Sequence, residues 1–119
     1  MAITATYLKR AEAVDVTANN GAATFSINLG DKPGKDVIII AENTSTTSAM
    51  TATLEIVAGD YLASATGDNA ITLGAGAVKA IALSESARYK NTAGEVDCKL
   101  SITASGDVRD VKISVIKLP

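Results

Sequence analysis

The chain has 119 residues and a formal net charge of −2, with no histidine, no tryptophan and one cysteine. This length predicts one domain, over residues 1–119, that can bury a core without cross-links. The absence of histidine excludes Ser-His-Asp and Cys-His catalysis, and the absence of any lysine or arginine run longer than two residues argues against a surface for nucleic acids.

Alternating apolar and polar residues predict the first strands. Residues 3–8 and 12–17 read as extended segments. The Asn-Asn-Gly sequence at 19–21 predicts a turn, because asparagine and glycine tolerate positive φ. Residues 24–29 predict a further strand, since their apolar members alternate with polar ones.

The middle of the chain contains its most apolar segment. Residues 30–35, with one proline and two glycines, predict a turn. Residues 37–42 are apolar on both phases, so we expect a central strand that is covered on both faces. A polar loop is predicted at 43–48, and residues 49–57 form the clearest amphipathic strand.

A second series of short elements follows. Residues 59–69 predict a loop or a broken edge strand, and 70–73 a short strand. The glycines at 74–76 predict a turn, after which residues 77–83 form the next strand.

The last part of the chain predicts two longer strands. Residues 84–91 are the least patterned segment that carries bulky side chains. The strands at 95–104 and 108–118 are separated by Ser-Gly-Asp at 105–107, which predicts a hairpin.

Together these segments predict an all-β fold, a single-domain antiparallel β-sandwich or barrel of about eight strands. No apolar run is long enough to cross a bilayer, and no secretory signal is recognisable, so we expect a chain made in a cytoplasm without membrane contact. Cys98 lies on the apolar phase of its strand, which predicts a buried structural thiol.

Motifs for chemistry are weak throughout. The thirteen Asp and Glu residues form no recognisable catalytic pair, and residues 30–36 fail as a phosphate loop because the spacing is short and no helix follows. Asp60, Asp68 and Asn69 lack the spacing of a calcium loop. We therefore expect no catalytic residue, no metal and no cofactor, and a protein that is not an enzyme.

Residues 84–91 are the main candidate for a contact surface. They include arginine and tyrosine, which are favoured in interface cores. The alternative is a surface loop held by a local Glu–Arg pair. The candidate contact residues, from this segment and two other predicted loops, are Glu85, Arg88, Tyr89, Tyr61, Thr44 and Thr46.

The order of segments along nearly the whole chain also carries a resemblance. The segments are Met-Ala-Ile-Thr-Ala (1–5), Ala-Val-Asp-Val-Thr (13–17), Val-Ile-Ile-Ile-Ala-Glu-Asn-Thr (37–44), Thr-Ala-Thr-Leu (51–54), Leu-Ser-Glu-Ser-Ala-Arg-Tyr-Lys-Asn (83–91) and Ile-Lys-Leu-Pro (116–119). This pattern resembles the small head proteins of tailed bacteriophages that decorate the capsid.

The resemblance implies a virion structural protein that binds the outer capsid surface and stabilises the head. The implied partners are the major capsid protein and further copies of the chain, with a trimer as one arrangement. The implied location is the capsid surface, after synthesis in the cytoplasm of a bacterial host. No site residue is carried over from the family.

Two other functions stay open. One is a different virion part, such as a tail tube, a head–tail connector or a fibre domain. The other is a sugar- or protein-binding β-sandwich module. The small number of aromatic residues, three tyrosines and one phenylalanine, counts against sugar binding, because a sugar face stacks on aromatic rings.

Overall fold

A computed structural model of the chain describes residues 2–29, 36–46, 50–57, 69–83, 95–103 and 106–118. The elements of these residues, in chain order, are β1 (Ala2–Thr4), β2 (Thr6–Tyr7), β3 (Asn19–Asn20), β4 (Thr24–Asn28), β5 (Val37–Asn43), β6 (Ala52–Ile56), β7 (Asn69–Leu73), β8 (Val78–Leu83), β9 (Glu95–Ile102), the 3₁₀ helix η2 (Val108–Asp110) and β10 (Val111–Lys117). The predicted all-β class is confirmed.

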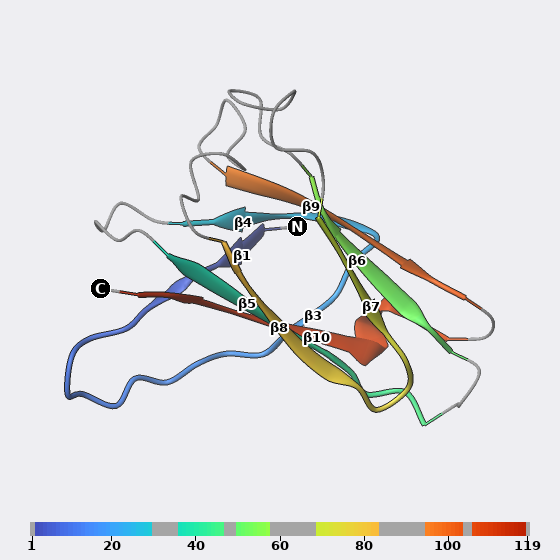
Figure 1. Cartoon of the computed structure of the whole chain (residues 1–119), viewed down its shortest axis with the longest axis horizontal. Coiled ribbons are helices and arrows are strands. Elements are labelled where there is room, and N and C mark those ends of the chain that lie inside the picture. Colours follow the sequence, from blue (N-terminus) through green and yellow to red (C-terminus); the bar gives the residue numbers. More distant parts are fainter. Residues whose placement is uncertain are drawn as a thin grey trace.

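The strands lie in two sheets that pack on one another (Figure 1). The first, sheet A, has the strand order β1-β4-β9-β6-β7. The second, sheet B, has the order β2-β10-β5-β8, and β3 pairs with the start of β10. Of the two predicted architectures, the structure is therefore the sandwich.

The N-terminal segment makes both sheets mixed rather than wholly antiparallel. β1 runs parallel to β4 at the edge of sheet A, and β2 runs parallel to β10 in sheet B. Between them the Ala5 N–H donates to the Asn28 carbonyl at 2.9 Å. One extended segment thus passes from sheet A to sheet B and closes this side of the sandwich.

β7 and β8 form the other side of the sandwich. They are consecutive in the chain but are the last strands of opposite sheets. The predicted turn between them is confirmed: the Ala77 N–H donates to the Gly74 carbonyl at 3.0 Å, and Gly76 has a φ of 76°. Glycine occupies this conformation without the steric cost that a side chain meets there.

Apolar side chains from the inner faces of both sheets form one core. Its fully buried members include Ile3, Ile27, Ile39, Met50, Leu54, Ile56, Leu73, Val96, Val111 and Ile113. Cys98 is part of this core, as predicted, with 2% of its surface exposed. Burial, and secondarily the charge of Asp97, raises the pKa of its thiol to about 12.

β5 is the central strand that the sequence predicted, but only one of its faces is fully buried. Val37, Ile39 and Ala41 point into the core. Ile38 and Ile40, on the opposite phase, are only half-buried. The expectation that both faces are covered is wrong. Apolar residues on both phases of a strand do not show whether other parts of the chain pack against both of its faces.

Two predictions for residues 12–21 are also wrong. Residues 12–17 form no strand, and Val16 is 42% exposed. Asn19 and Asn20 do not turn the chain but form β3 against β10. Gly21 permits close packing here, since a Cβ would lie 2.6 Å from Leu100 Cδ2 and 2.7 Å from the Val108 carbonyl oxygen.

The predicted hairpin at 105–107 is wrong because β9 belongs to sheet A and β10 to sheet B. Helix η2 carries the chain between the sheets. Its N-cap, Asp107, accepts from the Arg109 N–H at 2.9 Å, and Asp110 accepts from the Asp107 N–H at 3.3 Å. This reciprocal capping satisfies backbone donors at the start of the turn.

Asn43, at the end of β5, ties sheet B to sheet A. It is fully buried, and its Nδ2 donates to the Leu73 carbonyl at 3.2 Å and the Met50 carbonyl at 3.3 Å. Its Oδ1 accepts from the Ser45 N–H at 3.1 Å. Buried polar groups are tolerated only when they are hydrogen-bonded, so this side chain is built into the fold.

Candidate functional site

Two of the six predicted contact residues lie within the described part of the chain. Thr44 and Thr46 are both exposed. Thr44 Oγ1 donates to the Asp110 carbonyl at 2.6 Å, and the Thr44 N–H donates to the same oxygen at 2.9 Å. Thr44 therefore fastens the end of β5 to η2. The other four, Glu85, Arg88, Tyr89 and Tyr61, lie outside the described residues.

The outer face of sheet A is polar. Its polar residues on the four strands β4, β9, β6 and β7, here called the polar face, are Thr24, Ser26, Asn28, Glu95, Asp97, Lys99, Ser101, Thr53, Glu55 and Thr72. Ala70 of β7 is an apolar residue among them. Lys99 lies opposite Thr24 on one neighbouring strand and Glu55 on the other. This mixture of hydroxyl, carboxylate and ammonium groups is a well-hydrated surface.

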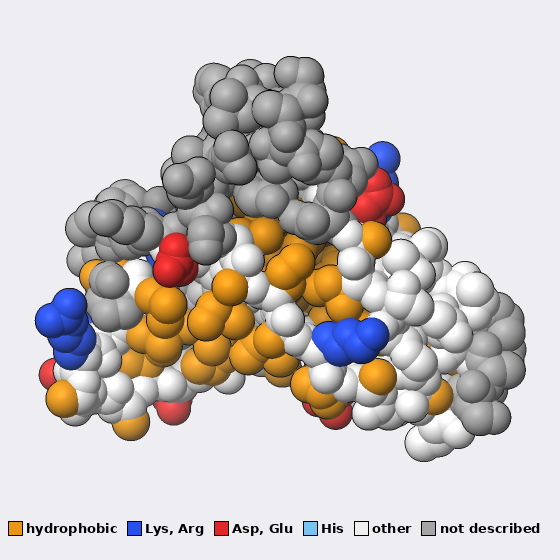
Figure 2. Space-filling model, in the orientation of Figure 1, with side chains coloured by type: hydrophobic (Ala, Val, Ile, Leu, Met, Phe, Trp, Pro, Cys, Tyr) orange, Lys and Arg blue, Asp and Glu red, His pale blue; other side chains and the backbone are white. Residues whose placement is uncertain are grey.

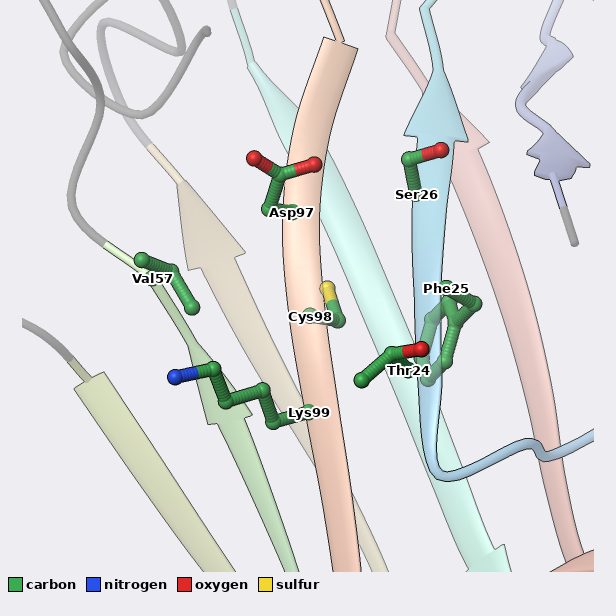
Figure 3. A pocket seen from close by; sticks show the side chains of 7 residues that line it. All are labelled: Thr24, Phe25, Ser26, Val57, Asp97, Cys98 and Lys99. Carbon is green, nitrogen blue, oxygen red and sulfur yellow. The ribbon is translucent and has the colours of Figure 1, made fainter.

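A depression of about 380 Å³ lies on sheet A. Asp97 and Lys99 reach toward it from β9, Thr24 and Ser26 from β4, and Val57 from the end of β6 (Figure 3). Asp97 and Lys99 are exposed, where water screens charge. These two residues thus bring a carboxylate and an ammonium group, both in contact with water, to the rim of the depression.

The outer face of sheet B is apolar along β8 and at Ile38, Ile40 and Ile116, and polar at Glu42, Ser114 and Lys112. In Figure 2, where sheet B is seen obliquely, hydrophobic side chains gather in the middle of the view, around β5 and β8 and in the direction of β6. The apolar residues of this surface, here called the apolar face, are Ile38, Ile40, Ile116, Val78, Ala80 and Ala82.

Cross-strand register arranges the apolar face in rows. Ile38 lies between Ile116 of β10 and Ala82 of β8. Ile40 lies between Ser114 and Ala80, and Val78 lies opposite Glu42. Val78 is 58% exposed, and Ala80 and Ala82 are exposed as well. Large contiguous apolar patches on the surface of a folded protein are typical of sites of contact with another molecule.

The apolar face ends at β8, the last strand of sheet B. The burial pattern of β8 differs from that of the strands with two neighbours, because only Leu83 is buried and Ile81 is half-buried. Among the described strands, none pairs with the second side of β8. Within the described part of the chain, this strand thus presents both apolar side chains and unpaired backbone hydrogen-bonding groups.

Other kinds of site are not found in the described part of the chain. No three Cys, Asp or Glu side chains there come together as metal ligands. No helix of the described residues has the length and hydropathy that a membrane span needs. The exposed Arg109 hydrogen-bonds to Asp107 and lowers the pKa of that carboxyl, which is part of the η2 cap.

Comparison of the chain with protein-family models, with curated proteins and with solved structures found no match. The function is therefore argued from the geometry of the surfaces.

Sequence reasoning missed the apolar face. Its signal was present in two places: the doubly apolar run of β5, and the small residues that alternate along β8. By itself the run predicts a strand covered on both faces, and the alanines of β8 point to no function. The register that joins these strands into one surface is not visible in a single segment.

Proposed function

We propose that the protein is a non-enzymatic structural component of a virion, which binds the outer surface of a tailed-phage capsid and stabilises the head. The observation that carries this proposal is the apolar face of sheet B. An array of isoleucine, valine and alanine side chains that extends over three strands fits a protein surface better than a small molecule, which needs a concave site.

The contrast between the two outer faces supports the orientation of binding. In this proposal the apolar face lies against the major capsid protein. The polar face of sheet A then points to water and keeps the decorated particle soluble. Each copy needs only a moderate contact, because many copies on one shell act together.

The central position of Ile40 allows a sharp test with a matched control. Ile40 and Thr53 are both half-buried, and each lies on a strand with a neighbour on both sides, but on opposite faces of the sandwich. We expect Ile40→Glu to weaken co-sedimentation with capsids of the phage that encodes the chain by about 10-fold or more, since a carboxylate would be desolvated in the contact. Thr53→Glu should bind like the wild type.

Immunogold electron microscopy of phage particles gives the second measurement. Label on the head supports the proposal. Label on the tail would move the function to a tail tube, connector or fibre, and an absence of label on any particle would overturn a virion role. Equal capsid binding by the wild type and Ile40→Glu would remove the apolar face from the proposal.

A further inference from the structure

The direction in which β8 presents its backbone, on the side where no described strand pairs with it, follows from its pairing with β5. The Asn43 N–H donates to the Ala77 carbonyl at 2.9 Å, which places Ala77 on the bonded phase of this ladder. In an antiparallel pair the bonded residues alternate, so Lys79, Ile81 and Leu83 turn their backbone groups toward β5. The N–H and C=O groups of Val78, Ala80 and Ala82 therefore point away from sheet B.

The usual protections of an edge strand are sparse on β8. Natural edges are kept apart by prolines, bulges, short strands or inward-pointing charges. β8 has six residues and no proline, and its one protection of this kind is Lys79, near its start on the inward phase opposite Ala41. On the opposite side of sheet B the edge is the two-residue β2, which offers little backbone to a partner.

We propose that β8 pairs antiparallel with β8 of a second copy of this chain, which joins the two copies of sheet B into one continuous sheet. The two-fold axis passes through Ile81, which lies opposite Ile81 of the partner subunit. Ala80 then exchanges its outward N–H and C=O with Ala82 of the partner subunit, and the second such pair follows by symmetry.

The sequence of β8 fits a second copy because Ala80-Ile81-Ala82 reads the same in both directions. An isologous interface requires one surface to be complementary to itself. The members of both hydrogen-bonded pairs are alanines, whose small side chains lie on the outer side of the joined sheet. The isoleucines meet at a non-hydrogen-bonded pair, where cross-strand side chains lie closest.

Charge selects this register over its neighbour. With Ile81 on the axis, Lys79 lies opposite Leu83 of the partner subunit and about 13 Å along the ladder from its own symmetry copy. A register centred on Ala80 would instead make the two lysines diagonal neighbours, at about 7–8 Å. The first register leaves no like charges in contact and places the lysine stem along an apolar side chain.

This inference is independent of capsid binding, because the purified protein alone tests it. Light scattering after size exclusion and sedimentation equilibrium should show a dimer. The double variant Ala80→Lys/Ala82→Lys places lysines opposite each other at both bonded pairs, and should weaken the dimer about 100-fold or more. Both positions are exposed, so the fold should be kept, which a circular dichroism melt checks.

The matched control lies on the neighbouring edge strand. Ala70→Lys/Thr72→Lys introduces the same charges at two exposed positions of β7, the last strand of sheet A. This variant should remain dimeric. A wild type that is monomeric up to about 1 mM, a trimer, or a dimer that the β8 variant leaves intact would overturn the proposal.

Disulfide trapping tests the register even if the lysine variant fails to fold. Ile81→Cys should form a cross-linked dimer under mild oxidation, since directly opposite residues fall within disulfide reach. Lys79→Cys should not, because its symmetry copy is too far away. Cys98 is buried and does not compete. Efficient cross-linking through position 79 but not 81 would reject the stated register.

Discussion

The two outer faces of this sandwich obey the same alternation and yet differ in kind. On both sheets, every second residue points into a shared core. The remaining residues are mostly Thr, Ser, Asn, Asp, Glu and Lys on sheet A, with Ala70 among them, whereas on sheet B they include six Ile, Val and Ala side chains beside Glu42, Ser114 and Lys112. Because the core is made alike from both sheets, the difference between the outer faces is not required by the fold, and it is where function should be sought.

The two outer faces keep their contrast only while the two sheets stay packed together. Asn43→Ala removes the amide that bonds to backbone groups of both Met50 and Leu73 and leaves buried carbonyls without their donor. We expect a loss of about 3 kcal/mol in the free energy of unfolding, measured by urea denaturation. The matched variant Asn20→Ala, on an exposed residue, should cost less than about 0.5 kcal/mol. Equal costs would show that the buried amide does not join the sheets.

The second prediction concerns the close approach at Gly21. In Gly21→Ala the new Cβ would meet the Val108 carbonyl at 2.7 Å, and backbone yields less readily than a side chain. We expect a loss of about 2 kcal/mol in thermal or urea unfolding.

Gly74→Ala is the control for this substitution. A Cβ on Gly74 meets nothing within 4 Å, and the residue has no positive φ. Stability should stay within about 0.5 kcal/mol of the wild type or rise slightly, because alanine restricts the unfolded chain. If Gly21→Ala were as harmless as Gly74→Ala, the packing of β3 and η2 would be looser than the structure has it.

The third prediction uses Cys98, which lies directly beneath the polar face between Asp97 and Lys99. Its pKa is raised from 9.0 to about 12, so between these pH values the unfolded chain releases the thiol proton and the native protein retains it. Stability therefore falls as pH rises above 9.

At pH 10 this loss should be about 1 kcal/mol relative to pH 8. Comparison with Cys98→Val, a substitution that keeps the site apolar, isolates the thiol from other titrating groups. In the native wild type, a thiol reagent at pH 8 should react only after urea is added. Rapid labelling of the folded protein would show that the polar face is open to the core.

Much of the inner surface could be predicted from the sequence, because burial on one face imposes a period of two. Phe25, Ile27 and Leu29 all point inward as their alternation indicates. Cys98 does the same between its exposed neighbours. These predictions needed no knowledge of which strands pair.

Which strands pair, and which strand faces are covered, depends on residues far apart in the sequence, so local patterns predict these features poorly. The Ser-Gly-Asp turn before β10 looks like a hairpin, yet the strands on its two sides belong to different sheets. The Asn-Asn-Gly turn signal is outweighed by pairing of β3 with β10. Ile38 and Ile40 are predicted to be buried, because the sequence does not distinguish an apolar residue in the core from one on the surface.

The last prediction exchanges the character of the two faces while keeping strand propensity nearly constant. Isoleucine and threonine are both β-branched and both favour strands. Ile38→Thr/Ile40→Thr should therefore change the free energy of unfolding by less than about 1 kcal/mol per site, since the side chains are only half-buried. Retention on a hydrophobic-interaction column should fall clearly.

The reciprocal variant Thr53→Ile/Thr72→Ile, at directly paired positions of sheet A, should increase retention with a similarly small effect on stability. If neither double variant changed retention, the apolar face would not be the surface that binds the column. If it followed both while stability held, binding would be a property of the outer faces that this fold can carry on either sheet.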